Sequence, residues 1–135
     1  MSAARWFSGI LGGILVAYGV ACMLNPALLM APVGLTGKAA AQVEIRAMYG
    51  GVQIGFGLYC LLAARSAQRT GHALVVIASI FLSIAICRGL GMLLSQTGGA
   101  FHSAALCFEV VVGITSLWLW RAQTPAKKAP LKVPA

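Results

Sequence analysis

Four long apolar stretches, separated by short polar connectors, constrain this chain more than any other feature of its sequence. Each has close to the roughly 20 residues that a helix needs to cross ~30 Å of hydrocarbon at a rise of 1.5 Å per residue. They lack the period-two alternation of strands, and an open sheet edge cannot face lipid. The sequence therefore predicts an all-α fold, an integral membrane four-helix bundle. Its helices cover approximately residues 6–24, 44–64, 72–94 and 101–120.

The composition agrees with a lipid environment. Hydrophobic residues make up 60% of the chain and charged residues 9%, whereas an average soluble domain has about 25% charged residues. A water-soluble protein of 135 residues has too little interior to bury so much apolar surface. We expect one domain with four transmembrane helices over residues 1–121. The basic, proline-containing tail, residues 122–135, is expected to be disordered.

The positions of the basic residues predict the orientation of the chain in the membrane. Loop and terminal cations concentrate on one side of a path that crosses the bilayer four times, while Lys38 lies on the other side. Cytoplasmic loops carry the excess of Lys and Arg, so both termini are expected in the cytoplasm. The formal net charge of +8 does not indicate nucleic-acid binding, because the cations flank apolar stretches and do not share one face of a soluble domain. The cations on the predicted cytoplasmic side are Arg5, Arg65, Arg69, Arg121, Lys127, Lys128 and Lys132.

A few polar residues interrupt the apolar stretches near the non-cytoplasmic side. Helical periodicity places those of the second stretch on one face, and those of the fourth stretch on another. An ionisable side chain at this depth is costly unless it finds a partner inside the bundle. We therefore expect Glu109 to meet Arg88, Arg46 or both, with Glu44 as an alternative partner of the second arginine. The candidate ligand-binding residues are Glu44, Arg46, Tyr49, Gln53, Arg88, His102 and Glu109.

Two interpretations of this polar cluster remain open. Buried ion pairs can fix helix register without any further role. Ionisable residues inside a membrane are also candidates for a functional site. Two arginines around Glu109 would leave spare positive charge, which suits an anionic or strongly polar ligand.

The cysteines do not indicate a metal or redox centre. Cys22, Cys60, Cys87 and Cys107 form no Cys-x-x-Cys pair, and no histidine lies at metal-ligand spacing from any of them. Isolated cysteines inside helices commonly serve as small apolar residues. The sequence therefore predicts neither a metal nor a cofactor.

Glycines in the first two stretches predict close helix packing. Gly9 and Gly13 form one small-x-x-x-small pattern, and Gly51 and Gly55 form another. Such patterns let two helix backbones approach closely in a membrane. They favour helix contacts within the bundle over a homodimer interface, and both uses remain open.

The second stretch also resembles a known family. The sequence from Glu44 to Leu58, EIRAMYGGVQIGFGL, is similar to the central motif of the bacterial membrane proteins called domain of unknown function 4345. The similarity covers about residues 5–121 and includes Asn25-Pro26, Arg88 and Glu109. This family looks like a distant relative of DoxX-like four-helix membrane proteins. The resemblance implies a four-helix fold in the bacterial inner membrane, and it implies no activity.

Three functions remain compatible with the sequence. The first is a non-catalytic module that binds a small amphipathic or lipidic ligand, or a partner protein, at the polar cluster. The second is a small transporter that works as an oligomer. The third is a membrane isomerase or redox enzyme in which Glu109 acts as acid or base, assisted by Tyr49 or His102. The sequence contains no recognised catalytic motif, which favours the non-catalytic module.

Overall fold

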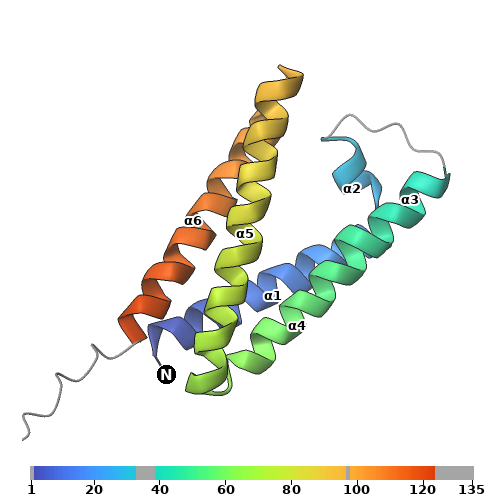
Figure 1. The fold of residues 1–135 in the computed structure, drawn as a ribbon. Coiled ribbons are helices and arrows are strands. Elements are labelled where there is room, and N and C mark those ends of the chain that lie inside the picture. Colours follow the sequence, from blue (N-terminus) through green and yellow to red (C-terminus); the bar gives the residue numbers. More distant parts are fainter. Residues whose placement is uncertain (1, 33–38, 97, 124–135) are drawn as a thin grey trace, which may run out of the picture.

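The computed structural model describes residues 2–32, 39–96 and 98–123, and its secondary structure within these ranges is helical (Figure 1). The all-α class is thus confirmed. The elements in chain order are α1 (Ala3–Leu24), α2 (Ala27–Met30), α3 (Ala39–Ile45), the π-helical turn η1 (Arg46–Gly51), α4 (Val52–Ala63), α5 (Ala67–Ser95) and α6 (Ala100–Gln123).

Three of these helices, α1, α5 and α6, are long and apolar enough to cross a membrane. The segments α3, η1 and α4 follow one another without a break and form a fourth rod (Figure 1). Hydropathy located all four rods but underestimated their lengths. For example, α5 begins at Ala67, five residues before the expected position. The polar residues at helix ends continue the backbone hydrogen bonding, and hydropathy does not detect that.

The predicted tail begins inside the last helix. Ala122 and Gln123 belong to α6, which the sequence expected to end near residue 120. The remainder of the tail, residues 124–135, lies outside the described residues.

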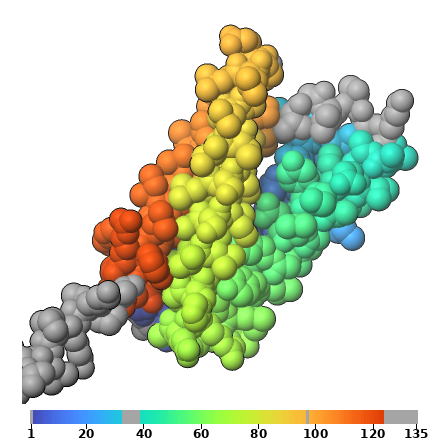
Figure 2. All heavy atoms as spheres, in the orientation of Figure 1, coloured from blue at the N-terminus to red at the C-terminus, as the bar shows by residue number. Residues whose placement is uncertain are grey.

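The rods are arranged as two antiparallel hairpins. One hairpin joins α1 to the α3–η1–α4 rod, and the other joins α5 to α6. They touch at the end where α1 begins and α4 gives way to α5, and they diverge toward the end that carries α2 and α3 (Figures 1 and 2). A closed four-helix bundle is therefore not confirmed, because the helices do not pack together along their whole length.

The hydrophobic core lies where the two hairpins meet. Leu11 and Leu15 of α1 pack with Cys60 of α4, Ile77 of α5 and Val112 of α6, and all five are buried. A second cluster at the divergent end holds α2 against α1 and α3. It consists of Cys22, Leu29, Met30 and Ile45.

Glycines bring the backbones of α1 and α4 into direct contact. A Cβ atom added to Gly12 would lie 2.7 Å from the carbonyl oxygen of Gly57, and one added to Gly57 would lie 2.7 Å from that of Gly12. Toward the divergent end, a Cβ atom on Gly19 would lie 2.8 Å from the oxygen of Gly50. The contact glycines are thus seven residues apart in each helix.

The glycine pairs named from the sequence do not make this contact. A Cβ atom on Gly13 or Gly55 would have no neighbour within 4 Å, and one on Gly51 would approach only the oxygen of Arg46 in its own helix. One on Gly9 would meet Ala64 at an ordinary 3.7 Å. The expected close packing is present, but the prediction named the wrong glycines because every small residue in an apolar stretch fits such a pattern.

Two arginines tie the ends of this first hairpin together. Arg5, in the first turn of α1, donates from Nε to the carbonyl of Ala64 at 2.7 Å and from Nη2 to that of Arg65 at 3.0 Å. Arg46 donates from Nε to the carbonyl of Met23 at 3.1 Å, near the end of α1. The last carbonyls of a helix lack partners inside that helix, so each arginine satisfies groups at the C-terminal end of the opposite helix.

Candidate functional site

A cavity of about 790 Å³ lies between the two hairpins. Its volume falls in the range of roughly 300–1,000 Å³ that is typical of small-molecule sites. Most of its lining is apolar, and both hairpins contribute polar side chains to it. The polar lining residues are Tyr18, Tyr49, Gln53, Arg88 and Glu109.

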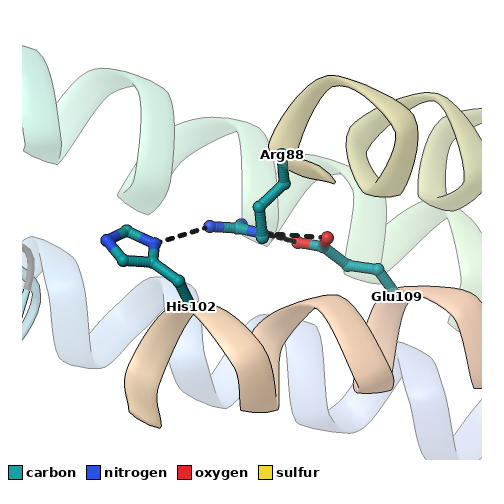
Figure 3. Close-up of polar contacts among 3 residues, drawn as sticks. All are labelled: Arg88, His102 and Glu109. Carbon is teal, nitrogen blue, oxygen red and sulfur yellow. Dashed lines mark hydrogen bonds and ion pairs between the residues drawn. The ribbon is translucent and has the colours of Figure 1, made fainter. Parts of the chain in front are cut away.

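An ion pair between α5 and α6 forms the charged part of the cavity (Figure 3). Arg88 donates from Nε to both carboxylate oxygens of Glu109, at 3.0 and 2.9 Å, and from Nη2 to Oε1 at 2.6 Å. The Glu109 side chain is 7% exposed and that of Arg88 is 25% exposed. Both oxygens of the buried carboxylate therefore have a charged donor, and the guanidinium retains a surface toward the cavity.

His102 lies on the other side of the Arg88 guanidinium from Glu109 (Figure 3). Nη1 of Arg88 is 3.5 Å from Nδ1 of His102. Arginine can only donate, so a hydrogen bond across this contact would use the Nδ1 lone pair as acceptor. The His102 ring also packs edge-on against Phe101, with ring centroids 5.6 Å apart. His102 therefore belongs to the polar cluster, although it does not line the cavity.

Arg46 does not join the cluster, contrary to one of the pairings expected from the sequence. Its guanidinium is bonded to the carbonyl of Met23, and it does not line the cavity. The π-helical turn from Arg46 to Gly51 contains more residues per turn than an α-helix, which shifts the faces that regular spacing assigns. Glu44 is exposed on α3 and also lies outside the cavity lining.

Tyr49 and Gln53 line the cavity from the opposite hairpin, as their spacing of one helical turn allows. Neither side chain has a hydrogen bond to another described residue, and both have surface open to the cavity. The Tyr49 phenol lies within electrostatic reach of the Arg88 guanidinium. Of the seven predicted residues, four line the cavity and a fifth, His102, lies beside Arg88; the four are Tyr49, Gln53, Arg88 and Glu109.

Tyr18 of α1 is a cavity residue that the sequence interpretation missed. Like Tyr49, it lies within electrostatic reach of Arg88. A signal was available, because a phenol in the middle of an apolar helix carries a polar group that needs a partner.

Aromatic rings form much of the apolar wall and were also missed. Phe81 of α5 and Phe108 of α6 pack edge to face, with centroids 5.8 Å apart, and both line the cavity with Phe56 and Phe101. Phe101 and Phe108 are seven residues apart, so they share one face of α6. In an apolar helix that periodicity does not separate a cavity wall from a lipid-facing surface.

No group of three or more metal-ligating side chains occurs within residues 2–32, 39–96 and 98–123. The four cysteines are free; Cys22 and Cys60 are buried, whereas Cys87 and Cys107 are exposed. The chemistry available in the cavity is therefore that of hydrogen bonds, one ion pair and aromatic surfaces.

Comparison with known proteins identifies the family. Residues 3–120 match the family described as "Domain of unknown function (DUF4345)". The chain belongs to this family. No curated protein and no solved structure matches the chain.

The range that matches the DUF4345 family spans both hairpins and includes every residue that lines the cavity. The description of the family names no ligand and no reaction.

Proposed function

We propose that this chain is a multi-pass membrane protein that binds a small amphipathic or lipidic ligand in the cavity between its hairpins, without converting it. The observation that carries this proposal is a cavity whose lining is mostly apolar but includes a few polar side chains from both hairpins. The aromatic walls suit a hydrocarbon chain or ring system, and the polar side chains offer hydrogen bonds to a head group. Such a lining is typical of sites that hold a largely apolar ligand in one orientation.

The energetics of a bilayer support an occupant. Tyr49 and Gln53 face the cavity without a hydrogen bond to another described residue. In hydrocarbon, each unsatisfied polar group costs several kcal/mol. A head group or bound water between Tyr49 and Arg88 would remove that cost.

We further propose four membrane crossings in a bacterial inner membrane, with both termini in the cytoplasm. The rod from Ala39 to Ala63 would be the fourth crossing, since at 1.5 Å per residue it exceeds ~30 Å of hydrocarbon. Arg5, Arg65, Arg69 and Arg121 lie at helix ends on the side of the molecule where α1 begins and α6 ends (Figure 1). This concentration of cations supports a cytoplasmic location for that side.

The geometry favours binding over catalysis by Glu109. A general acid or base must reach the proton that it transfers. Both oxygens of Glu109 accept hydrogen bonds from Arg88, so the carboxylate is already occupied. The enzyme alternative would require that pair to separate first.

The experiment that tests the proposal blocks the cavity and measures the bound ligand. Ala105 lines the cavity on α6, whereas Cys107 is exposed on the same helix and does not line it. We expect protein purified in mild detergent to carry a specific amphiphile, detected by mass spectrometry of its extract. Ala105→Phe should lose most of that compound, and Cys107→Phe should retain it.

Melting temperatures of both variants would establish that each is folded. Equal amounts of the compound in folded Ala105→Phe and in wild type would contradict the proposal. So would the absence of any compound enriched over an unrelated membrane protein purified in the same way.

A further inference from the structure

We infer that the ligand of this cavity has an uncharged head group that both donates and accepts hydrogen bonds, such as a hydroxylated or carbonyl-bearing amphiphile. The inference rests on the proposed function and names the chemical class of its ligand. It depends on the charges that the described residues place in the cavity.

The charges in the cavity cancel. Among the described residues that line the cavity, Arg88 supplies the only positive side-chain charge and Glu109 the only negative one, and the two side chains are joined by three hydrogen bonds. His102 does not line the cavity. The cavity therefore offers no free opposite charge to a charged head group. Because nothing would offset the loss of its hydration in this low-dielectric site, such a head group would bind at a high desolvation cost.

The second arginine that would have favoured an anion is engaged elsewhere. Arg46 is bonded to the carbonyl of Met23 and does not line the cavity. Glu44 is exposed on α3, so it supplies no charge to the cavity either. The spare positive charge expected from the sequence is therefore not present at this site.

The groups left for a ligand are neutral hydrogen-bonding groups. The Tyr49 hydroxyl and the Gln53 amide can each donate and accept, and no other described residue occupies them. They face Arg88 and Glu109 across the cavity, because they come from the opposite hairpin. A head group with a hydroxyl or carbonyl can bond to both sides at once.

Photolabelling with three matched probes tests the inference. Each probe carries the same diazirine-bearing hexadecyl chain, with a glycerol, a carboxylate or a trimethylammonium head. The full chain would be reconstituted in phosphatidylcholine nanodiscs, and labelled peptides would be mapped by mass spectrometry. We expect the glycerol probe to label cavity peptides about tenfold more than either charged probe, as an affinity of the cavity about tenfold higher for the glycerol head would give.

Variants of the ion pair provide a second readout. Glu109→Gln leaves Arg88 uncompensated and should shift the preference to the carboxylate probe, while Arg88→Gln should shift it to the trimethylammonium probe. The double variant should return the preference to the glycerol probe. Glu44→Gln, which changes a carboxylate outside the cavity, should leave the preference of wild type unchanged.

A pair of tyrosine variants tests the neutral contacts. Tyr49 and Tyr59 lie on the same rod with similar exposure, 45% and 40%, and only Tyr49 lines the cavity. Tyr49→Phe should weaken labelling by the glycerol probe several-fold, and Tyr59→Phe should not.

The outcomes separate the inference from the proposed function. Stronger labelling of the wild-type cavity by either charged probe would overturn the neutral head group while retaining an amphiphile site. Labelling by all three probes only outside the cavity would overturn both. The wild-type comparison alone decides between these results, even if an ion-pair variant fails to fold.

Discussion

At the scale of single residues, the pairing of Arg88 with Glu109 follows directly from electrostatics. A carboxylate in an apolar helix needs a charged donor, and the alternating direction of the helices left few candidates. The sequence therefore predicted this contact correctly. It could not predict that Arg46 would bond to the carbonyl of Met23, because a π-helical turn has no signature in hydrophobic periodicity.

The ion pair makes a prediction about stability. Arg88→Ala would leave Glu109, which is 7% exposed, without its counter-charge. Removing one partner of a buried pair typically costs about 3–5 kcal/mol. We expect a clear fall in the melting temperature, measured by circular dichroism in detergent, and little change for Arg69→Ala, whose side chain is exposed.

A double substitution separates the value of the pair from the cost of breaking it. Replacing both charges, in Arg88→Met with Glu109→Gln, removes the unpaired charge that either single change leaves behind. The double variant should therefore melt closer to wild type than Arg88→Ala does. A double variant that melts lower than both single variants would show that the pair itself supplies most of the stability.

At the scale of helices, glycine contacts decide how α1 meets α4. The substitution Gly57→Ala would place a Cβ atom 2.7 Å from the oxygen of Gly12 and 2.8 Å from the amide nitrogen of Val16. Backbone atoms at that distance cannot move aside alone, so the helices must separate. We expect destabilisation of about 1–3 kcal/mol, as for overpacking in other close-packed interiors.

Gly55 offers a matched control in the same helix. A Cβ atom at Gly55 would have no neighbour within 4 Å. Alanine is also the better helix former, by about 1 kcal/mol, so Gly55→Ala should be neutral or stabilising. A lower melting temperature for Gly55→Ala than for Gly57→Ala would contradict the packing described here.

Sequence reasoning was successful for the existence of the helices and less so for their packing. The lengths of the apolar stretches identified the four rods, because a helix that crosses hydrocarbon needs about 20 apolar residues in a row. Whether Gly9, Gly12, Gly13 or Gly19 contacts α4 depends on how α1 is rotated about its own axis, which hydropathy does not encode. Phe81 was missed for the same reason, because lipid-facing and cavity-facing residues are equally apolar, whereas the phenol of Tyr18 did offer a signal.

At the scale of the whole molecule, the four membrane crossings proposed above would place both termini on one side of the membrane. Fusion of a reporter to the carboxyl end tests this directly. A green fluorescent protein fused there should fluoresce, and an alkaline phosphatase should be inactive. Phosphatase inserted at the α5–α6 connection, residues 98–99, should be active, and the opposite pattern would exclude the proposed topology.

The divergence of the two hairpins leads to the last prediction. Their largest shared core lies at one end, where Leu11, Ile77 and Val112 pack together; farther along, the cavity lies between them and Phe101 packs against the cluster around Cys22. An occupant that contacts both walls should therefore restrict their relative motion. Spin labels at Val43 and Leu94, which are exposed on α3 and α5, would report the spacing of the divergent ends.

We expect a broad distance distribution for this pair in the absence of amphiphile, and a narrower one after addition of the glycerol-headed probe. Native cysteines would be replaced first. Labels at Leu62 and Trp118 provide the control, because these exposed positions lie near the joined end of the hairpins and should give the same distribution with and without the probe. Unchanged distributions at both pairs would show that the occupant does not bridge the hairpins, whereas narrowing at the divergent end alone would place it between them.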